Sequence, residues 1–174
     1  LNLTCSLNSY LHFYSASTVK AIILAALLRK ADSQLEFDLD LATKTSQENP
    51  VYYVQYAHAR LASLFREAES RNVPMPAKDA VDVSLLDLEE EQNIIKMLSR
   101  YPEIVEDAAL AYEPHRLTYY LQELAGLLHN YYFKHRVIAD DARRSAAKLF
   151  LMKQVKTVIQ SALGILGVTA PERM

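Results

Sequence analysis

The side chains best suited to make specific contacts are concentrated in residues 49–60, which read NPVYYVQYAHAR. Phenol, amide, imidazole and guanidinium groups follow one another there, on Tyr52, Tyr53, Gln55, Tyr56, His58 and Arg60. All of these groups can donate hydrogen bonds. So many donors within nine residues predict a surface that either contacts a partner or joins this element to its neighbours.

The pattern around this stretch predicts the helix that positions it. Asn49 is a good N-cap because its side-chain oxygen can accept from the first unpaired amides, and Pro50 follows where a missing N–H costs nothing. Apolar residues then recur every three or four positions, at Val54, Ala57, Leu61, Leu64 and Ala68. This stripe predicts an amphipathic helix from Pro50 to about Ser70.

The sequence holds no set of residues suited to catalysis or metal binding. The five histidines are His12, His58, His115, His129 and His135. None occurs in an HExxH or ExxH spacing, so structural histidines are favoured over zinc or di-iron ligands. Glu36, Asp38 and Asp40 alternate as in calcium loops, but the glycine and closing glutamate of such a loop are missing. With no Gly-rich phosphate loop or serine nucleophile elbow, we predict no catalytic residue and no metal site.

Length and composition favour one helical domain. A chain of 174 residues can bury roughly 70% of the surface that its unfolded form exposes. Only 3 Gly and 6 Pro in a sequence that is 51% hydrophobic are typical of an all-α protein. Leu1 in place of Met, without a basic region behind it, indicates a cut or foreign end rather than a secretory signal.

The same composition indicates where the protein works. The single cysteine, Cys5, cannot form an internal disulfide, which favours a reducing compartment such as the cytoplasm. The longest apolar run, Ala21–Leu28, is far shorter than the ~20 residues of a membrane-spanning helix. We therefore expect a soluble, cytoplasmic protein.

Further helices are predicted on both sides of the long one. A short apolar helix is expected over Val19–Lys30, an extended connection over Leu35–Leu41, and a loop over Asn72–Asp79. Asp87 and Glu90 have the spacing of a capping box, which predicts the start of a helix there.

Three more helices follow. One is expected over residues 102–112 and the next over residues 115–135, with Pro residues at both starts. Asp140 or Asp141 should cap the last helix, whose apolar residues surround most of its circumference and so predict a central position. Gly167 is expected just after its end, with the tail behind it folded back against the bundle.

Charge is unevenly distributed along the chain. Residues 134–174 hold eight Lys and Arg against three acids, a net of +5, whereas residues 1–133 hold eleven against eighteen, a net of −7. This asymmetry favours contact between a polyanion and the C-terminal part. A dipolar surface without a partner is the alternative.

Three segments resemble arginyl-tRNA synthetases of the bacterial type. The NPVYYVQYAHAR helix and the RKADSQLEFDLDLATKTSQE before it are similar to part of their C-terminal, anticodon-binding module. Residues 101–138 resemble its middle helices, and residues 149–174 end on the Pro-Glu-Arg-Met that finishes those enzymes. The resemblance covers residues 29–174, which we take as one domain. Residues 1–28 do not match, because residues 20–23 lack the family's Asp-Ala-x-Arg.

This resemblance implies a single helical bundle that binds the tRNA anticodon and positions tRNA(Arg) for arginylation by a catalytic domain. The contacts carried over from the family are Tyr132, Arg136 and Met174, followed by the basic Arg143, Arg144 and Lys148. RNA loops are read by stacking bases on aromatic or guanidinium planes, and Tyr132 and Arg136 are expected on one helical face. Met174 would offer a polarizable surface to a base near Tyr132. Alternatively, Tyr132 is a core tyrosine with an internally bonded hydroxyl.

The resemblance implies only a structural or indirect role for the opening stretch, namely for Asn49, Tyr53, Gln55, Tyr56, His58 and Arg60. The ATP-binding signatures of class I synthetases, of the His-Ile-Gly-His and Lys-Met-Ser-Lys types, are absent. We therefore expect that this chain is not an enzyme by itself and that it holds no cofactor. Its parent enzyme would use ATP with magnesium. The expected partners are tRNA(Arg) and the parent's catalytic domain, with the chain monomeric. A helical protein-interaction domain without RNA binding is the alternative.

Overall fold

The computed structural model describes residues 48–77 and 81–174, and these residues form helices and loops without a strand. The elements are α4 (Pro50–Ser70), the 3-10 turn η2 (Val83–Leu85), α5 (Glu89–Ser99), α6 (Tyr101–Leu110), α7 (His115–Lys134) and α8 (Ala142–Ile165). The predicted all-α fold is confirmed. The predicted helix over Val19–Lys30, the Leu35–Leu41 connection and the boundary at residue 28 lie outside the described residues.

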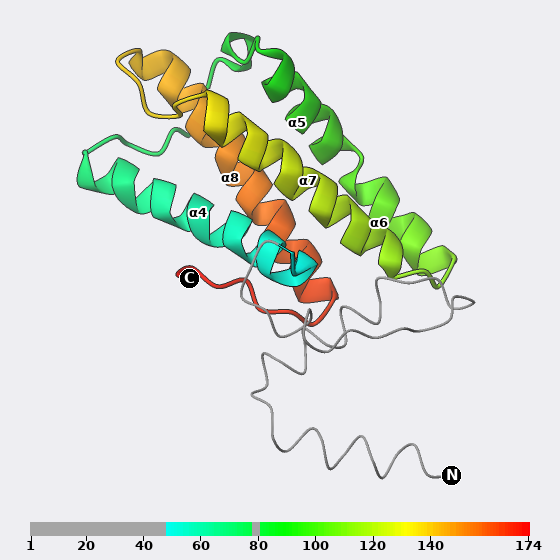
Figure 1. The fold of residues 1–174 in the computed structure, drawn as a ribbon. Helices are drawn as coiled ribbons and strands as arrows, with labels where there is room; N and C mark the ends of the chain where they lie inside the picture. The colour runs from blue at the N-terminus through cyan, green and yellow to red at the C-terminus, as the bar shows by residue number, and fades with distance from the viewer. Residues whose placement is uncertain (1–47, 78–80) are drawn as a thin grey trace, which may run out of the picture.

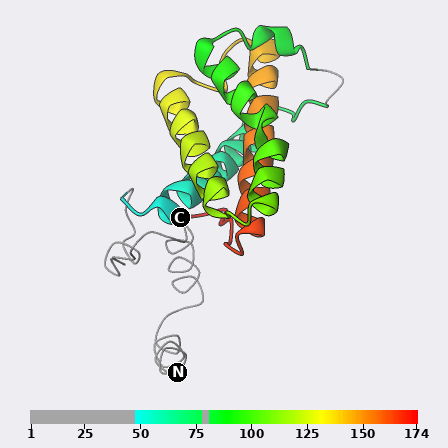
Figure 2. The same ribbon diagram turned by 90° about the vertical axis from the view of Figure 1, so that its right-hand side faces the viewer.

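Helices α7 and α8 form the middle of the bundle. Helix α4 packs against both of them, while α5 and α6 follow one another along the opposite side (Figure 1). Figure 2 shows the same order from the side, with α5 and α6 in front of α4. Helix α8 contacts α4, α5 and α7, and its Leu149, Met152 and Val155 are fully buried. The predicted central position of the last helix is therefore confirmed.

Two of the predicted helix starts are confirmed in detail. The Asn49 side chain accepts hydrogen bonds from the amides of Val51 at 3.0 Å and Tyr52 at 3.4 Å. The Asp141 side chain accepts from the Arg144 amide at 3.0 Å. Each cap satisfies amides that have no partner inside the helix, so α4 and α8 begin where the sequence predicts.

The predicted capping box of Asp87 and Glu90 is wrong. The N-cap of α5 is Leu88, whose backbone N–H donates to the Glu91 carboxylate at 3.2 Å. Glu91 lies three positions before Ile94 on the apolar face of the helix, and both side chains have 0% exposure. Burying that face places Glu91 in the core and leaves Glu90 half-buried beside Lys134, so packing selects Glu91 rather than Glu90 as the capping carboxylate.

Glu91 also joins α5 to α7. The Tyr131 hydroxyl donates to its carboxylate at 2.8 Å, and both side chains are fully buried. Burial and the neighbouring carboxylate raise the pKa of Tyr131 far above its usual value, so this phenol stays protonated and remains a donor. The pair is a fixed polar link inside an apolar core.

Gly167 ends α8 as predicted. Its φ is 70°, and the Val168 amide donates back to the Leu163 carbonyl at 2.8 Å, which forms a Schellman motif. The same arrangement ends α6, where the Glu113 amide donates to the Ala108 carbonyl at 2.9 Å. There the left-handed position is occupied by Tyr112, with a φ of 55° that residues other than Gly, Asn and Asp rarely adopt.

Candidate nucleic-acid interface

The C-terminal tail returns along α4 after Gly167. The Gln55 amide group donates to the carbonyl oxygen of Thr169 at 2.8 Å, and a ring nitrogen of His58 lies 2.8 Å from the carbonyl oxygen of Pro171. These bonds confirm the prediction that the tail folds back against the bundle. They also hold the tail by its main chain.

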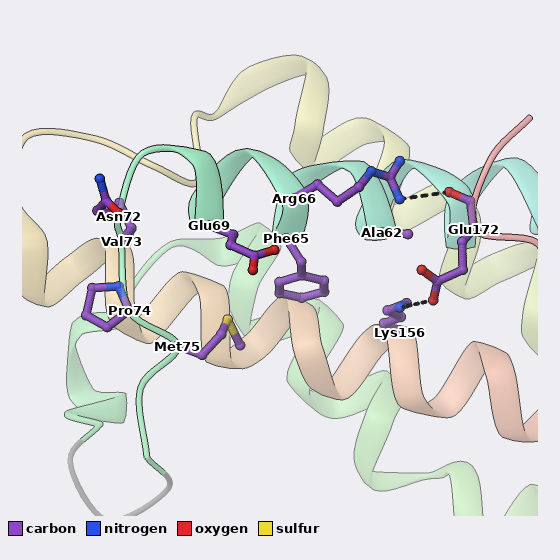
Figure 3. A pocket seen from close by; sticks show the side chains of 10 residues that line it. All are labelled: Ala62, Phe65, Arg66, Glu69, Asn72, Val73, Pro74, Met75, Lys156 and Glu172. Atoms are coloured by element: carbon purple, nitrogen blue, oxygen red, sulfur yellow. Dashed lines mark hydrogen bonds and ion pairs between the residues drawn. The ribbon is translucent and has the colours of Figure 1, made fainter.

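Two cations hold the next residue of the tail, Glu172. Arg66 of α4 donates to its carbonyl oxygen at 3.2 Å, and Lys156 of α8 pairs with its carboxylate at 2.7 Å. Figure 3 shows the two side chains reaching Glu172 from different helices. Lys156 lowers the pKa of the Glu172 carboxyl, which keeps it ionised. The tail is thus attached to both α4 and α8.

Two hollows flank this attachment. One, of about 510 Å³, lies between α4 and α8 and has Phe65, Val73, Pro74 and Met75 among its lining residues (Figure 3). The other, of about 390 Å³, contains the end of the chain. Its lining residues are Tyr56, Ala59, Arg60, Ser63, Arg66, Glu172, Arg173 and Met174. We call this second hollow the tail groove.

Arg60 connects the tail groove to Tyr132 of α7. Its guanidinium carbon lies 4.5 Å from the centroid of the Tyr132 ring, within the range of a cation–π contact. Met174 lines the same groove and is 52% exposed. The structure therefore brings two of the predicted contacts close to Arg60: Tyr132 contacts its guanidinium, and Met174 lines the same groove.

The Tyr132 side chain is half-buried, and its hydroxyl is buried without a hydrogen-bond partner among the described residues. Burial raises the pKa of this hydroxyl well above its usual value, so the phenol is neutral. The Tyr132 ring packs against the core, as the alternative of a core tyrosine expects, but the internal hydrogen bond of that alternative is not found among the described residues. Contact between Tyr132 and RNA stays a prediction.

Arg136 does not share a helical face with Tyr132, contrary to expectation. Helix α7 ends at Lys134, and His135 has extended backbone angles (φ −130°, ψ 141°). Arg136 is exposed in the following connection, where its carbonyl oxygen accepts from the Lys148 ammonium at 3.1 Å. Its predicted role in RNA binding stays a prediction, but α7 does not orient its side chain.

The other predicted basic contacts are engaged within the protein. Arg143 pairs with Asp82 and Arg144 with Asp87, each at 3.1 Å. Lys148 is only 7% exposed, which favours a structural role over a phosphate contact. The two arginine pairs are exposed, and such pairs contribute only ~0–1 kcal/mol, so phosphates could replace the acids.

These pairs offset part of the positive charge of the C-terminal part. Basic residues of the C-terminal part meet acids of the preceding part in the fold, as Lys134 does with Glu90 at 2.8 Å. That lysine lowers the pKa of the Glu90 carboxyl to about 2. The exposed cations Arg136, Lys153 and Arg173 are not among the ion pairs found in the described part of the chain.

The opening stretch of the sequence largely joins α4 to its neighbours. The Tyr53 and Tyr56 rings lie 4.7 Å and 5.5 Å from the His129 ring of α7. Asn49 caps the helix, and Gln55 and His58 hold the tail. This arrangement favours the structural or indirect role expected for these residues. Tyr56 and Arg60 also line the tail groove, and Arg60 alone of this stretch contacts the Tyr132 ring in the cation–π pairs described.

Two residues were not predicted: one lines the tail groove, and the other is an exposed aromatic residue of α7. Arg66 lines the tail groove and holds Glu172, but nothing in the sequence indicates the path of the tail beside it. Phe133 is 90% exposed and directly follows Tyr132. In the sequence, an apolar stripe is formed by Leu117, Leu121, Leu124 and Leu128. Phe133 lies off this stripe, and its exposure to solvent could have been predicted from that position.

The described residues contain no group of three His, Cys, Asp or Glu side chains placed to hold a metal ion. None of the helices described is long and apolar enough to cross a membrane. What the bundle does present is a groove lined by guanidinium groups, bordered by an aromatic ring and closed by a chain terminus. RNA loops are read by stacking bases on planar groups of this kind, so the tail groove is a candidate RNA-binding site.

Comparison with known families identifies the domain. The family described as DALR anticodon binding domain matches residues 54–174, and the chain belongs to this family. Arginine–tRNA ligase from Syntrophotalea carbinolica is 57% identical over 148 residues, a match that covers 85% of this chain and 27% of that protein. The corresponding enzyme from Geobacter metallireducens is 53% identical, with 85% and 26% covered. The chain thus spans about a quarter of the length of these relatives.

Solved structures have the same fold. Arginyl-tRNA synthetase from Thermus thermophilus is similar with a TM-score of 0.72 and 28% identity, over 90% of this chain and 26% of that one. Arginyl-tRNA synthetase from Plasmodium falciparum has a TM-score of 0.77 at 21% identity, over 99% of this chain and 31% of that one. The second similarity concerns the fold alone.

Proposed function

We propose that this chain is the tRNA anticodon-binding module of an arginyl-tRNA synthetase, and that it positions tRNA(Arg) for ATP-dependent arginylation by a catalytic domain outside these 174 residues. Membership of the DALR anticodon binding domain family supports the proposal. The structural observation that carries it is the tail groove, where Arg60 stacks on Tyr132 and Met174 lies alongside. Family membership and the tail groove both favour RNA binding over a protein-interaction domain.

In this proposal the groove receives a base of the anticodon loop. One face of the Arg60 guanidinium is covered by Tyr132, and a splayed base stacks against the exposed planar groups of the groove. Arg66, Arg136 and Arg173 supply positive charge for the phosphates on either side. The parent enzyme uses ATP with magnesium in its catalytic domain, and this chain holds neither. We further propose that the protein acts in the cytoplasm and that the module is monomeric.

Binding to a tRNA(Arg) transcript, measured by fluorescence anisotropy at several salt concentrations, tests the proposal. If roughly three to five phosphates are neutralised, log K should fall against log salt with a slope near −2 to −4. The same preparation should show no arginine-dependent exchange of pyrophosphate into ATP. Salt-independent affinity, or no affinity at low salt, would contradict the proposed function.

A further inference from the structure

Three side chains of α4 hold three successive parts of the tail, and each bonds a main-chain carbonyl oxygen. Gln55 contacts Thr169, His58 contacts Pro171, and Arg66 contacts Glu172. Because carbonyl oxygens are the same in every residue, these bonds fix the path of the tail and not its side chains. We call Gln55, His58 and Arg66 the tail latch.

His58 is the most enclosed member of the tail latch. It is 1% exposed, and its Nδ1 lies 2.8 Å from the Pro171 oxygen. Pro171 has no N–H and a restricted φ, so a bond to its carbonyl fixes the direction of the residues that follow. Those residues are Glu172, Arg173 and Met174, which all line the tail groove beside Arg60.

A tail of this kind would ordinarily be mobile, since chain ends are poorly ordered unless they are tied down. If RNA had to order it on binding, affinity would fall by ~10-fold for each residue that is fixed. The tail latch removes this cost before RNA arrives. Preorganisation of this type strengthens binding without adding a contact.

We propose that His58 is a positioning residue for tRNA binding: its hydrogen bond to Pro171 holds Arg173 and Met174 in the tail groove, ready to meet an anticodon-loop base. The inference rests on the proposed function and goes beyond it by assigning a buried residue that touches no RNA. It predicts that His58 and the last two residues act together, so their effects on tRNA binding are not additive.

A double-mutant cycle on the full 174-residue chain tests this inference. His58→Leu removes the ring nitrogen that bonds Pro171 and keeps a side chain of similar volume. Deletion of Arg173 and Met174 removes the residues that the tail latch positions. We expect each change alone to weaken tRNA(Arg) binding by about tenfold. In a chain that already carries His58→Leu, the deletion should weaken tRNA(Arg) binding by less than about twofold. Independent, additive losses would overturn the inference.

The rate at which carboxypeptidase releases Met174 is a second readout, and it needs no RNA. Release should be about tenfold faster in His58→Leu, because an unlatched tail enters the protease readily. Gln55→Ala should accelerate the release of Met174 as well. Because Gln55 is half-buried, this variant replaces His58→Leu in the double-mutant cycle if His58→Leu does not fold. Gln92→Ala is the matched control, since it loses a comparable bond to the Leu86 carbonyl (2.6 Å). An unchanged release rate in Gln55→Ala and His58→Leu would overturn the inference.

The two proposals can fail separately. If the unaltered chain does not bind tRNA(Arg), the proposed function fails and the role of His58 in it falls too, whatever the protease shows. If the chain binds tRNA(Arg) but the cycle is additive, only the inference about His58 is overturned.

Discussion

Replacing Arg60 by alanine should separate RNA binding from folding. The guanidinium is half-buried and lies 4.5 Å from the Tyr132 ring centroid in the free protein. This contact contributes ~0.5–1 kcal/mol to stability, which corresponds to a fall in Tm of roughly 1–4 °C for a chain of this length. Stacking of a base contributes ~1–3 kcal/mol, so Arg60→Ala should weaken tRNA(Arg) binding by roughly 5- to 150-fold.

The measurement is anisotropy with labelled tRNA(Arg), together with a thermal melt of each variant. Arg60→Lys keeps the positive charge but lacks the planar guanidinium group. It should preserve the salt dependence of tRNA(Arg) binding and recover little of the affinity that is lost in Arg60→Ala. Tyr132→Phe should bind as the unaltered chain does, because the hydroxyl is buried and the ring that supports Arg60 is kept. Arg71→Ala is the control, because Arg71 is an exposed arginine at the C-cap of α4 that pairs with Glu67. Binding by Arg60→Ala within about twofold of the unaltered chain would refute the stacking argument.

Three further predictions concern the fold. Tyr131→Phe removes the donor to one oxygen of the buried Glu91 carboxylate and leaves the Leu88 amide on the other. It should cost ~1–3 kcal/mol in a denaturant titration, more than Tyr120→Phe, which loses a bond to a backbone carbonyl at 3.1 Å. Equal losses would contradict the special role of the Tyr131 link. Tyr112→Gly should raise the free energy of unfolding by ~1 kcal/mol, because Tyr112 has a φ of 55° and is 91% exposed. A loss of stability would contradict the strain argument. Burial lowers the pKa of His58 and His129 below that of an unfolded histidine. As the pH falls, these two histidines are therefore protonated in the unfolded chain before they are protonated in the folded one. The free energy of unfolding should then decline below about pH 6.5, and Tm should fall with it. His129→Gln should make this fall in Tm less steep.

The sequence predicted the helices whose ends are set by local chemistry. Asn49 and Pro50 locate the start of α4, Asp141 starts α8, and Gly167 ends it, since each uses a side chain or backbone conformation that acts within one turn. The start of α5 was mispredicted, because the burial of Ile94 beside Glu91 depends on the packing partner of the helix.

The site was less predictable than the fold. Arg136 was expected on the face of Tyr132, but α7 ends two residues too early for that. Net charge along the chain suggested a basic surface, whereas folding brings Arg143 and Arg144 to acids more than 50 residues away, at separations of 61 and 57. The tail groove joins segments over a hundred residues apart, such as Arg66 and Glu172 at a separation of 106. No local pattern encodes such a contact.

The central claim is that this domain recognises the anticodon loop of tRNA(Arg) through the tail groove. The most direct test compares the affinity of the chain for intact tRNA(Arg) and for the same tRNA with its anticodon loop replaced by a stable tetraloop, at one salt concentration. Loss of a stacked base should weaken binding by about tenfold or more, whereas removal of the acceptor end should change it little. Equal affinity for the intact and loop-replaced tRNA would contradict the account.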